Sequence, residues 1–290
     1  MRKSVLVTGS NGQLGSELKA LSGDYKEYEF LFVTREELDF SQPERMSEFF
    51  EERHFDILIN CAAYTAVDKA ESEETLADKI NHIAVKKLAE ISKAQEMSLI
   101  HISTDYVYDG KNYKPYVEDD DVSPQSVYGK TKLLGEKAIL ETKLQNSMVI
   151  RTSWVYSSFG NNFVKTMLKL GKQKDELGVV FDQIGTPTYA KDLAKGIIDL
   201  LPRLNNKETE TYHYSNEGTC SWYDFAKSIF ELSGVACYVK PIETKDYPTP
   251  AQRPFYSLLN KNKIKNKFDI NIPYWRDSLQ DCLDSLKVKK

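Results

Sequence analysis

A tyrosine and a lysine four residues apart could carry acid–base chemistry. Tyr128 and Lys132 precede an apolar pattern that predicts a helix, and a helix would place both side chains on one face. A tyrosine phenol, with a pKa of about 10, is a weak acid at neutral pH, but a nearby ammonium group lowers that value. The pair could therefore give a proton to a substrate oxygen or remove one. The same spacing is common on helix surfaces, so the surrounding elements decide the interpretation.

A glycine-rich turn near the N-terminus predicts a dinucleotide site. Residues 4–8 are apolar and β-branched, as in a buried strand, and the spacing GxxGxxG follows before a helical pattern. In such a turn Gly9 permits the tight bend, Gly12 lets the backbone approach a pyrophosphate, and Gly15 lets the helix pack closely on the strand. The start of the helix would then face the phosphates with its free N–H groups.

The end of the second predicted strand bears on which dinucleotide binds. Residues 29–33 form this strand, and Thr34 and Arg35 follow it. An acidic residue here usually binds the ribose 2′-hydroxyl of NAD, whereas Arg35 could pair with a 2′-phosphate. This favours NADPH and leaves NADH open as a second cofactor, while Arg35 could equally be a surface residue. Asp39 could bond the adenine amino group or cap the helix expected near Pro43.

Two further strands are predicted to have their carboxyl ends on the same side of the sheet as the glycine turn. Residues 55–60 lead into Ala62 and Ala63, whose small side chains would let a cofactor lie against the backbone, although ordinary packing also explains them. Residues 98–103 lead into Thr104 and Asp105, at the end of the strand where ligands bind in open α/β sheets. The Thr104 hydroxyl could hold a carbonyl oxygen beside the tyrosine.

A histidine within the fourth predicted strand is interpreted as a core residue rather than as a catalyst. His101 alternates with apolar positions, and such a residue is more often a satisfied core histidine than a catalyst. We therefore leave His101 out of the predicted site.

Strands and helices alternate as far as a fifth predicted strand at residues 148–152. This alternation predicts an α/β fold, a Rossmann-type, doubly wound parallel sheet with right-handed connections. We assign residues 1–153 to the dinucleotide-binding domain. Residues 154–290 are expected to form mainly a smaller C-terminal substrate-binding lobe, with some segments returning to the core.

The second half of the chain is predicted to contain helices joined by longer loops. A proline-containing loop is expected at residues 241–256, and it carries Arg253, either a clamp for a substrate phosphate or a member of a surface salt bridge. Helices are expected at residues 73–96 in the first half, and at residues 190–201, 221–232 and 275–287 in the second.

Composition excludes several classes of protein. The chain has 290 residues, 41% hydrophobic and 28% charged, which is typical of globular proteins, and its net charge of -4 argues against nucleic-acid binding. It shows no apolar run of membrane-spanning length, and the start of the sequence leads into a strand rather than a signal peptide. The four cysteines lack CxxC spacing, so we expect reduced thiols in a cytoplasmic protein.

Together these motifs resemble the extended short-chain dehydrogenase/reductase family, and within it the branch of the dTDP-4-dehydrorhamnose reductases. The resemblance covers nearly the whole chain. The glycine motif belongs to many families, whereas the runs YTAVD at residues 64–68 and RTSW at residues 151–154 are specific to this branch.

This resemblance implies a reaction and roles for three residues. The reaction is reduction by NADPH of the 4-keto group of dTDP-4-dehydro-β-L-rhamnose to dTDP-L-rhamnose, the last step of dTDP-rhamnose biosynthesis. Tyr128 would donate the proton, and Thr104 would hydrogen-bond the keto oxygen. Lys132 would bind the nicotinamide ribose and make the phenol more acidic.

The resemblance also implies two sets of contacts. The cofactor would contact Gly9, Asn11, Gly12, Gln13, Leu14, Gly15, Arg35, Asp39, Phe40, Ala62, Ala63, Tyr64, Thr65, Tyr128 and Lys132. The sugar nucleotide would contact Val67, Thr104, Asp105, Tyr128, Trp154, Asn162 and Arg253.

The sequence leaves the oligomeric state open between monomer and homodimer. Some relatives hold Mg²⁺ between acidic residues of a dimer, but here Lys191 stands near where one acid would be needed, so the sequence supports no metal site. The acidic run at residues 118–121 is most simply a solvated loop.

Two alternative functions are kept. The first is another sugar-nucleotide enzyme of the same fold, an epimerase or dehydratase, which usually needs further acid–base residues beside the threonine. Asp105 follows Thr104, but no dehydratase-type acidic pair is present. The second is a non-catalytic subunit resembling the regulatory β subunit of methionine adenosyltransferase, against which the intact Thr104, Tyr128 and Lys132 argue.

Overall fold

The computed structural model describes residues 2–288, and a six-stranded parallel sheet forms its centre. The strand order is β10-β5-β4-β3-β1-β2, and each neighbouring pair is parallel. The order of the chain reverses between β1 and β3, and ligands bind beyond the strand ends at such a point. The strands are β1 (Lys3–Thr8), β2 (Tyr28–Phe32), β3 (Ile57–Asn60), β4 (Ser98–Thr104), β5 (Met148–Thr152) and β10 (Glu210–His213).

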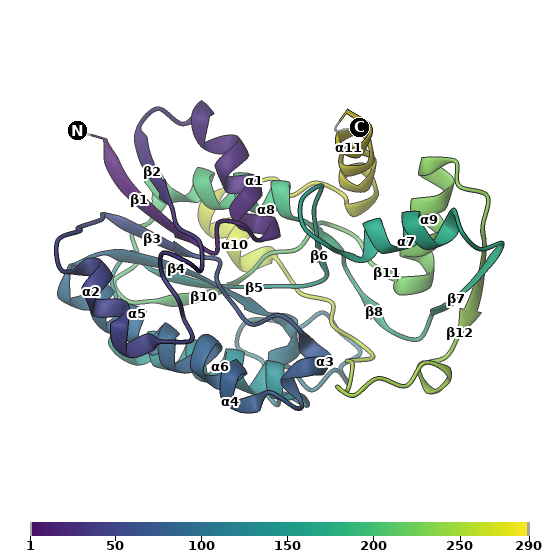
Figure 1. The fold of residues 1–290 in the computed structure, drawn as a ribbon, viewed down its shortest axis with the longest axis horizontal. Coiled ribbons are helices and arrows are strands. Elements are labelled where there is room, and N and C mark those ends of the chain that lie inside the picture. The colour runs from purple at the N-terminus through teal and green to yellow at the C-terminus, as the bar shows by residue number, and fades with distance from the viewer. Residues whose placement is uncertain (1, 289–290) are drawn as a thin grey trace.

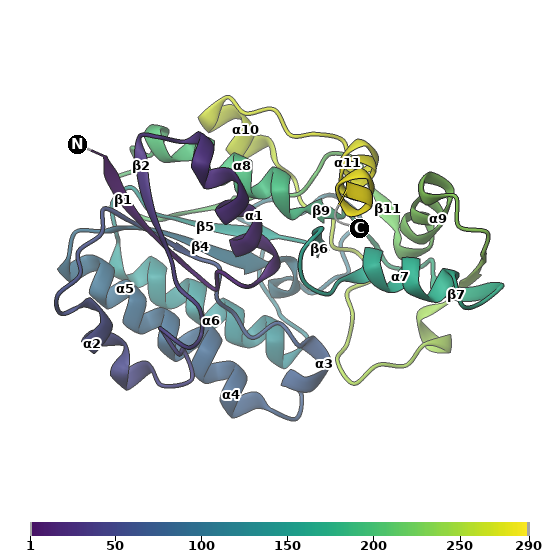
Figure 2. The ribbon, with the colours of Figure 1, turned by 45° about the horizontal axis from the view of Figure 1, so that its top comes forward.

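Helices cover both faces of this sheet (Figures 1 and 2). A strand buried on both faces needs a continuous apolar run, and Val5, Leu6 and Val7 of β1 are accordingly inaccessible to solvent. One layer contains α1 (Gln13–Leu21), α8 (Ala190–Leu200) and α10 (Asn262–Phe268), and the other contains α2 (Met46–Phe50), α4 (Glu74–Asp78), α5 (Ala84–Ala94) and α6 (Val127–Thr142).

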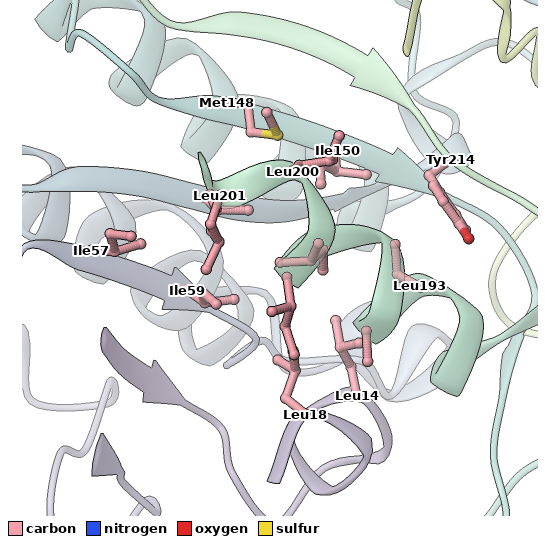
Figure 3. Packing of buried hydrophobic residues seen from close by; sticks show 14 of the residues in the cluster. Leu14, Leu18, Ile57, Ile59, Met148, Ile150, Leu193, Leu200, Leu201 and Tyr214 are labelled. Atoms are coloured by element: carbon pink, nitrogen blue, oxygen red, sulfur yellow. The ribbon is translucent and has the colours of Figure 1, made fainter. Parts of the chain in front are cut away.

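The packing of α1 and α8 on the sheet fixes the start of the chain relative to its middle. Figure 3 shows Leu14 and Leu18 of α1 pointing toward Leu193 and the other α8 side chains, beneath the apolar side chains of β3 and β5. All of these belong to one buried cluster. This packing fixes the position of the glycine turn, which precedes α1, at the carboxyl end of β1.

A smaller unit lies beyond the carboxyl ends of the strands (Figure 1). It has a core of its own, in which Phe225, Ile229 and Leu279 are fully buried. Its elements are α7 (Phe163–Gly171), β7 (Glu176–Val180), α9 (Trp222–Ser233), β12 (Tyr238–Ile242) and α11 (Trp275–Val288). Short strands connect it to the sheet: β6 (Val155–Tyr156) pairs with β9 (Thr188–Tyr189), and β8 (Ile184–Gly185) with β11 (Cys220–Ser221).

The predicted doubly wound parallel sheet is confirmed. The second half of the chain also contributes β10, α8 and α10 to the layers of the sheet, and the division at residue 153 stays a prediction. Between residues 2 and 288, no helix combines the length and apolar character needed to cross a bilayer.

One local prediction was wrong at its start. The expected loop at residues 241–256 begins late, because β12 continues to Ile242 and pairs with β7. Pro241 lies within this strand, as it can in a two-stranded sheet that has a free edge. The helix expected at about residues 73–96 is present: α4, a π-helical turn at Lys79–Ile83 and α5 follow one another without a break from Glu74 to Ala94.

Candidate active site

The carboxyl ends of the central strands and the smaller unit enclose a cleft of about 1530 Å³. Every residue predicted to contact cofactor or substrate lines this cleft, with the exception of Gly15. The residues brought together are Gly9, Asn11, Gly12, Gln13, Leu14, Arg35, Asp39, Phe40, Ala62, Ala63, Tyr64, Thr65, Val67, Thr104, Asp105, Tyr128, Lys132, Trp154, Asn162 and Arg253.

The glycine turn has no room for side chains. Gly9 has a φ of +65°, and a Cβ there would lie 2.7 Å from the backbone nitrogen of Ala62. A Cβ on Gly15 would lie 2.5 Å from the Gly9 carbonyl oxygen, so Gly15 packs the helix against the turn instead of lining the cleft. Gly12 precedes α1 without a side-chain cap, which leaves the first N–H groups of the helix free for an anion. The turn fits a pyrophosphate.

Arg35 and Asp39 form an ion pair at the rim of the cleft. The Arg35 Nε atom lies 3.3 Å from the Asp39 carboxylate, and the Arg35 side chain is 71% exposed. Asp39 also accepts a hydrogen bond from the Ser41 backbone N–H at 2.9 Å. The suggestion that Asp39 caps the helix near Pro43 was wrong, because Gln42 stands at that cap position.

A polar residue inside the helical segment shapes the cofactor side of the cleft. The Asn81 side chain accepts from the Tyr64 backbone N–H at 2.9 Å and donates to the Tyr64 carbonyl oxygen at 3.1 Å. Its amide also donates to the Thr131 hydroxyl on α6. Asn81, which is fully buried, therefore holds the loop after β3 against α6 and fixes Tyr64 in the cleft wall.

Thr104 and Tyr128 meet at the end of β4. Ser126 caps α6 by accepting a hydrogen bond from the Gly129 N–H, which sets Tyr128 in the first turn, facing the cleft. The Thr104 hydroxyl donates to Asp105 Oδ1 at 2.9 Å. Loss of contact with water raises the pKa of Tyr128, a hydrogen bond with Thr104 opposes this shift, and the charge of Asp105 adds to it. The phenol is thus kept protonated at neutral pH.

Lys132 lies one turn after the tyrosine and is 1% exposed. Its Nζ atom donates to the Ile102 carbonyl oxygen at 2.7 Å and lies 3.1 Å from His101 Nε2. Burial lowers the pKa of Lys132 to about 8, against the opposing effects of Glu136 and Cys61. A lowering of the phenol pKa by Lys132 stays a prediction.

His101 has a partner that the sequence did not indicate. Its interpretation as a satisfied core histidine is right, because it is fully buried and both ring nitrogens have partners. One of those partners is Lys132, which the alternating pattern of β4 alone could not reveal. The pairing of His101 with Asn60 in adjacent strands could have drawn attention to it.

The smaller unit closes the cleft through two contacts. The Trp154 ring stacks on Trp222, with centroids 3.7 Å apart, and Trp154 has a φ of +48°. Asn162 caps α7 and donates to the side chain of Gln13 at 2.9 Å, which joins this unit to the glycine turn. Sequence reasoning missed Trp222, since nothing local connects it to Trp154.

Arg253 is held by two residues from the first half of the chain. Its guanidinium group lies 2.6 Å from Asp68 Oδ2 and 3.1 Å from the Tyr106 hydroxyl. Asp68 also accepts from the Ala251 backbone N–H at 3.2 Å. The salt-bridge alternative for Arg253 is therefore realised, at a position that still lines the cleft.

Two carboxylates of the acidic run accept hydrogen bonds from backbone N–H groups, one from a distant segment and one from a nearby residue. Glu118 accepts from the His213 backbone N–H, and Asp120 accepts from the Val117 N–H. Within residues 2–288, no group of three or more His, Cys, Asp or Glu side chains is placed to hold a metal ion.

Asp105→Asn is expected to stabilise the protein at neutral pH. Burial raises the pKa of Asp105 from 3.8 to about 6, and its Oδ2 atom has no hydrogen-bond partner among the described residues. The nearby Ser257 hydroxyl favours the ionised form and only partly offsets burial. Between these two pKa values the folded chain binds more protons than the unfolded chain, so the free energy of unfolding falls as pH rises. Removing the charge should recover about 2–3 kcal/mol above that window.

Urea unfolding of the natural protein and Asp105→Asn at two pH values tests this expectation. The gain should be present above pH ~6 and absent below pH ~4. A gain of equal size at both pH values would mean that the charge of Asp105 is not the cause.

Comparisons with known proteins agree with this geometry. Residues 1–288 match the family described as the RmlD substrate binding domain. A dTDP-4-dehydrorhamnose reductase from Aggregatibacter actinomycetemcomitans is 41% identical, over 96% of this chain and 97% of its own length.

Two solved structures are also similar. A dTDP-4-dehydrorhamnose reductase from Clostridium acetobutylicum is 44% identical, with a TM-score of 0.91 over 98% of this chain and 99% of its own. One from Bacillus anthracis, in complex with NADP, is 38% identical, with a TM-score of 0.91 over 98% of this chain and 100% of its own. The chain therefore belongs to the RmlD substrate binding domain family, together with the dTDP-4-dehydrorhamnose reductases.

Proposed function

We propose that this chain uses NADPH to reduce the 4-keto group of dTDP-4-dehydro-β-L-rhamnose to dTDP-L-rhamnose, the last step of dTDP-rhamnose biosynthesis. The observation that carries the proposal is the meeting of Thr104, Tyr128 and Lys132 in the cleft that begins at the glycine turn. The relative solved with NADP supports the choice of cofactor.

The residues of the chain can supply the acid–base part of this reaction. NADPH, when bound, provides the hydride for C4 of the sugar. As negative charge develops on the sugar oxygen, the Tyr128 hydroxyl hydrogen-bonds it and gives up its proton. The Thr104 hydroxyl, which donates to Asp105 in this structure, turns to donate to the same oxygen. Lys132, when charged, makes release of the tyrosine proton easier.

The remaining predicted contacts are proposed to position the two ligands. The N–H groups around Gly12 and Gln13 would hold the pyrophosphate, and Ala63 and Tyr64 would border the cofactor. The Trp154 ring would offer an apolar face to the sugar. Arg253 would help to hold the nucleotide phosphates while it keeps its bond to Asp68.

Arg35→Ala is expected to weaken NADPH binding by about tenfold and to leave NADH binding unchanged. The guanidinium group is exposed at the cleft rim, where it can pair with a 2′-phosphate. Loss of one charge-assisted hydrogen bond weakens binding by about tenfold. Dissociation constants for both cofactors provide the measurement, with Arg45→Ala as a control, since Arg45 is also exposed but does not line the cleft. Equal weakening of both cofactors would remove Arg35 from 2′-phosphate recognition.

Mass analysis of the product tests the proposal against its two alternatives. A reductase yields a product with two more hydrogens than the substrate, and one NADPH is consumed for each product formed. An epimerase or dehydratase retains its cofactor through the cycle, and a dehydratase product lacks one water. A non-catalytic subunit yields no product and is expected to co-purify with a partner enzyme.

We further propose that the protein acts in the cytoplasm on a small-molecule sugar nucleotide, as a monomer or homodimer. The four cysteines are free thiols, which is consistent with a reducing compartment.

A further inference from the structure

Four buried polar side chains lie in a row beneath the candidate active site. They cross from β1 through β3 and β4 to α6, and none is more than 1% exposed. The Thr8 hydroxyl donates to Asn60 Oδ1 at 2.7 Å, and Asn60 Nδ2 lies 2.9 Å from His101 Nδ1. His101 Nε2 lies 3.1 Å from Lys132 Nζ. The row therefore ends on one of the three residues proposed to carry the chemistry.

One backbone group fixes the direction of the hydrogen bonds. The Ala62 backbone N–H donates to Asn60 Oδ1 at 3.1 Å, and because a backbone N–H can only donate, the accepting atom must be the amide oxygen. The amide nitrogen of Asn60 then donates to His101 Nδ1. A neutral imidazole that accepts at Nδ1 carries its proton on Nε2. Burial holds the pKa of His101 well below its ordinary value, so the ring is neutral.

The Nε2–H group of His101 points at Lys132. An ammonium group has only donors, so a charged Lys132 would set one donor against another at 3.1 Å. An uncharged amine has a lone pair that accepts from His101, and one of its own N–H groups donates to the Ile102 carbonyl oxygen. The observed contacts are thus satisfied by the amine and not by the ammonium.

The other groups around Lys132 have opposing effects on its protonation. Glu136, one turn later on α6, and Cys61, just after β3, favour the charged form. Burial of the side chain disfavours it and is the larger effect. Tyr128 stands one turn earlier on the same helix. The Nε2–H group of His101 and the burial of the side chain both favour the uncharged form of Lys132.

We propose that His101 is a positioning residue that acts through Lys132. Held as the Nε2–H tautomer by Asn60, it can donate to Lys132 Nζ only when that nitrogen is an amine, and it therefore opposes protonation of Lys132 in the ligand-free protein. One consequence rests on the proposed function: when Lys132 serves as the positive charge beside Tyr128, its ammonium group must turn away from the Nε2–H group of His101. The state of Lys132 in the ligand-free protein does not depend on that function.

NMR titration of the ligand-free, full-length chain tests this proposal. With lysines labelled at Cε with ¹³C, one signal should titrate at about pH 8, and Lys132→Met should remove it. In His101→Gln, whose amide can present its oxygen to Nζ, the midpoint should rise by about one pH unit. A midpoint near the ordinary lysine value of about 10.4 in the natural protein would overturn the proposal. An unchanged midpoint in His101→Gln would do the same.

A second variant covers the case in which His101→Gln does not fold. Asn60→Asp keeps an acceptor for the Thr8 hydroxyl and the Ala62 N–H, and its second oxygen requires His101 to donate from Nδ1. The imidazole then accepts at Nε2, and this acceptor and the new carboxylate both favour the ammonium, so the Lys132 midpoint should again rise. An unchanged midpoint would overturn the proposal.

A matched control separates hydrogen-bond direction from loosened packing. His213 is also fully buried and neutral, but its ring contacts the Tyr108 hydroxyl and the Asn260 carbonyl oxygen. His213→Gln should leave the Lys132 midpoint unchanged. An equal rise in this control would assign the shift to general loosening and overturn the proposal.

Discussion

Tyr128→Phe is expected to bind NADPH as the natural protein does and to lose turnover by about 100-fold or more. The substitution removes the hydroxyl and keeps the ring, which contacts Tyr106 edge-on with centroids 5.5 Å apart. The wall of the cleft should therefore keep its shape. The loss arises because the substitution removes the hydroxyl that is proposed to donate a proton to the sugar oxygen.

Steady-state turnover and the dissociation constant of NADPH, measured side by side, check this expectation. Tyr156→Phe is a suitable control, because the Tyr156 hydroxyl is buried, has no partner among the described residues and does not line the cleft. Tyr156→Phe should leave both the turnover and the dissociation constant of NADPH unchanged. Unchanged turnover in Tyr128→Phe would remove Tyr128 from the mechanism, and a loss of NADPH binding would show that the ring position had changed.

Arg151→Met is expected to destabilise the fold by about 3–5 kcal/mol, because it leaves a buried carboxylate without its cation. Arg151 on β5 contacts Glu136 on α6 through Nη2 at 2.7 Å and through Nε at 3.1 Å, and Glu136 is fully buried. Arg151 also donates to the Tyr108 hydroxyl at 2.7 Å. The pair holds α6, and with it Tyr128, against the sheet.

Denaturant unfolding of Arg151→Met gives the measurement. Arg276→Met is the matched control, since Arg276 contacts Glu231 at the same 2.7 Å but the Glu231 side chain is 69% exposed. The control should lose no more than about 1 kcal/mol. Losses of equal size in the two variants would contradict the assigned role of the buried pair.

Local patterns were enough to predict the first half of the fold. The strand, glycine turn and helix at the N-terminus depend on residues that are adjacent in sequence, and the structure places Gly9 and Gly12 at the cleft as expected. Tyr128 and Lys132 share a face because helical periodicity alone fixes their relation. Because the strands are parallel, Thr104 at the carboxyl end of its strand lies on the same side of the sheet as the glycine turn.

The rest depends on contacts between distant segments. β10 joins the sheet beside β5 although its four residues carry no strong strand pattern. Trp154 meets Trp222, and Asp68 meets Arg253, only after the smaller unit has folded over the strand ends. The contact between His101 and Lys132 requires both the register of β4 and the placement of α6. The periodicity of a single helix or strand cannot predict contacts between residues so far apart in the sequence.

Oxidation of NADPH in the presence of dTDP-4-dehydro-L-rhamnose, generated in place by the preceding epimerase, tests the central claim most directly. Absorbance at the reduced-nicotinamide band should fall only when both sugar and protein are present, faster with NADPH than with NADH, and the fall should disappear in Tyr128→Phe. Tight cofactor binding without sugar-dependent oxidation would contradict the proposed reduction and indicate a different nucleotide sugar or a non-catalytic role.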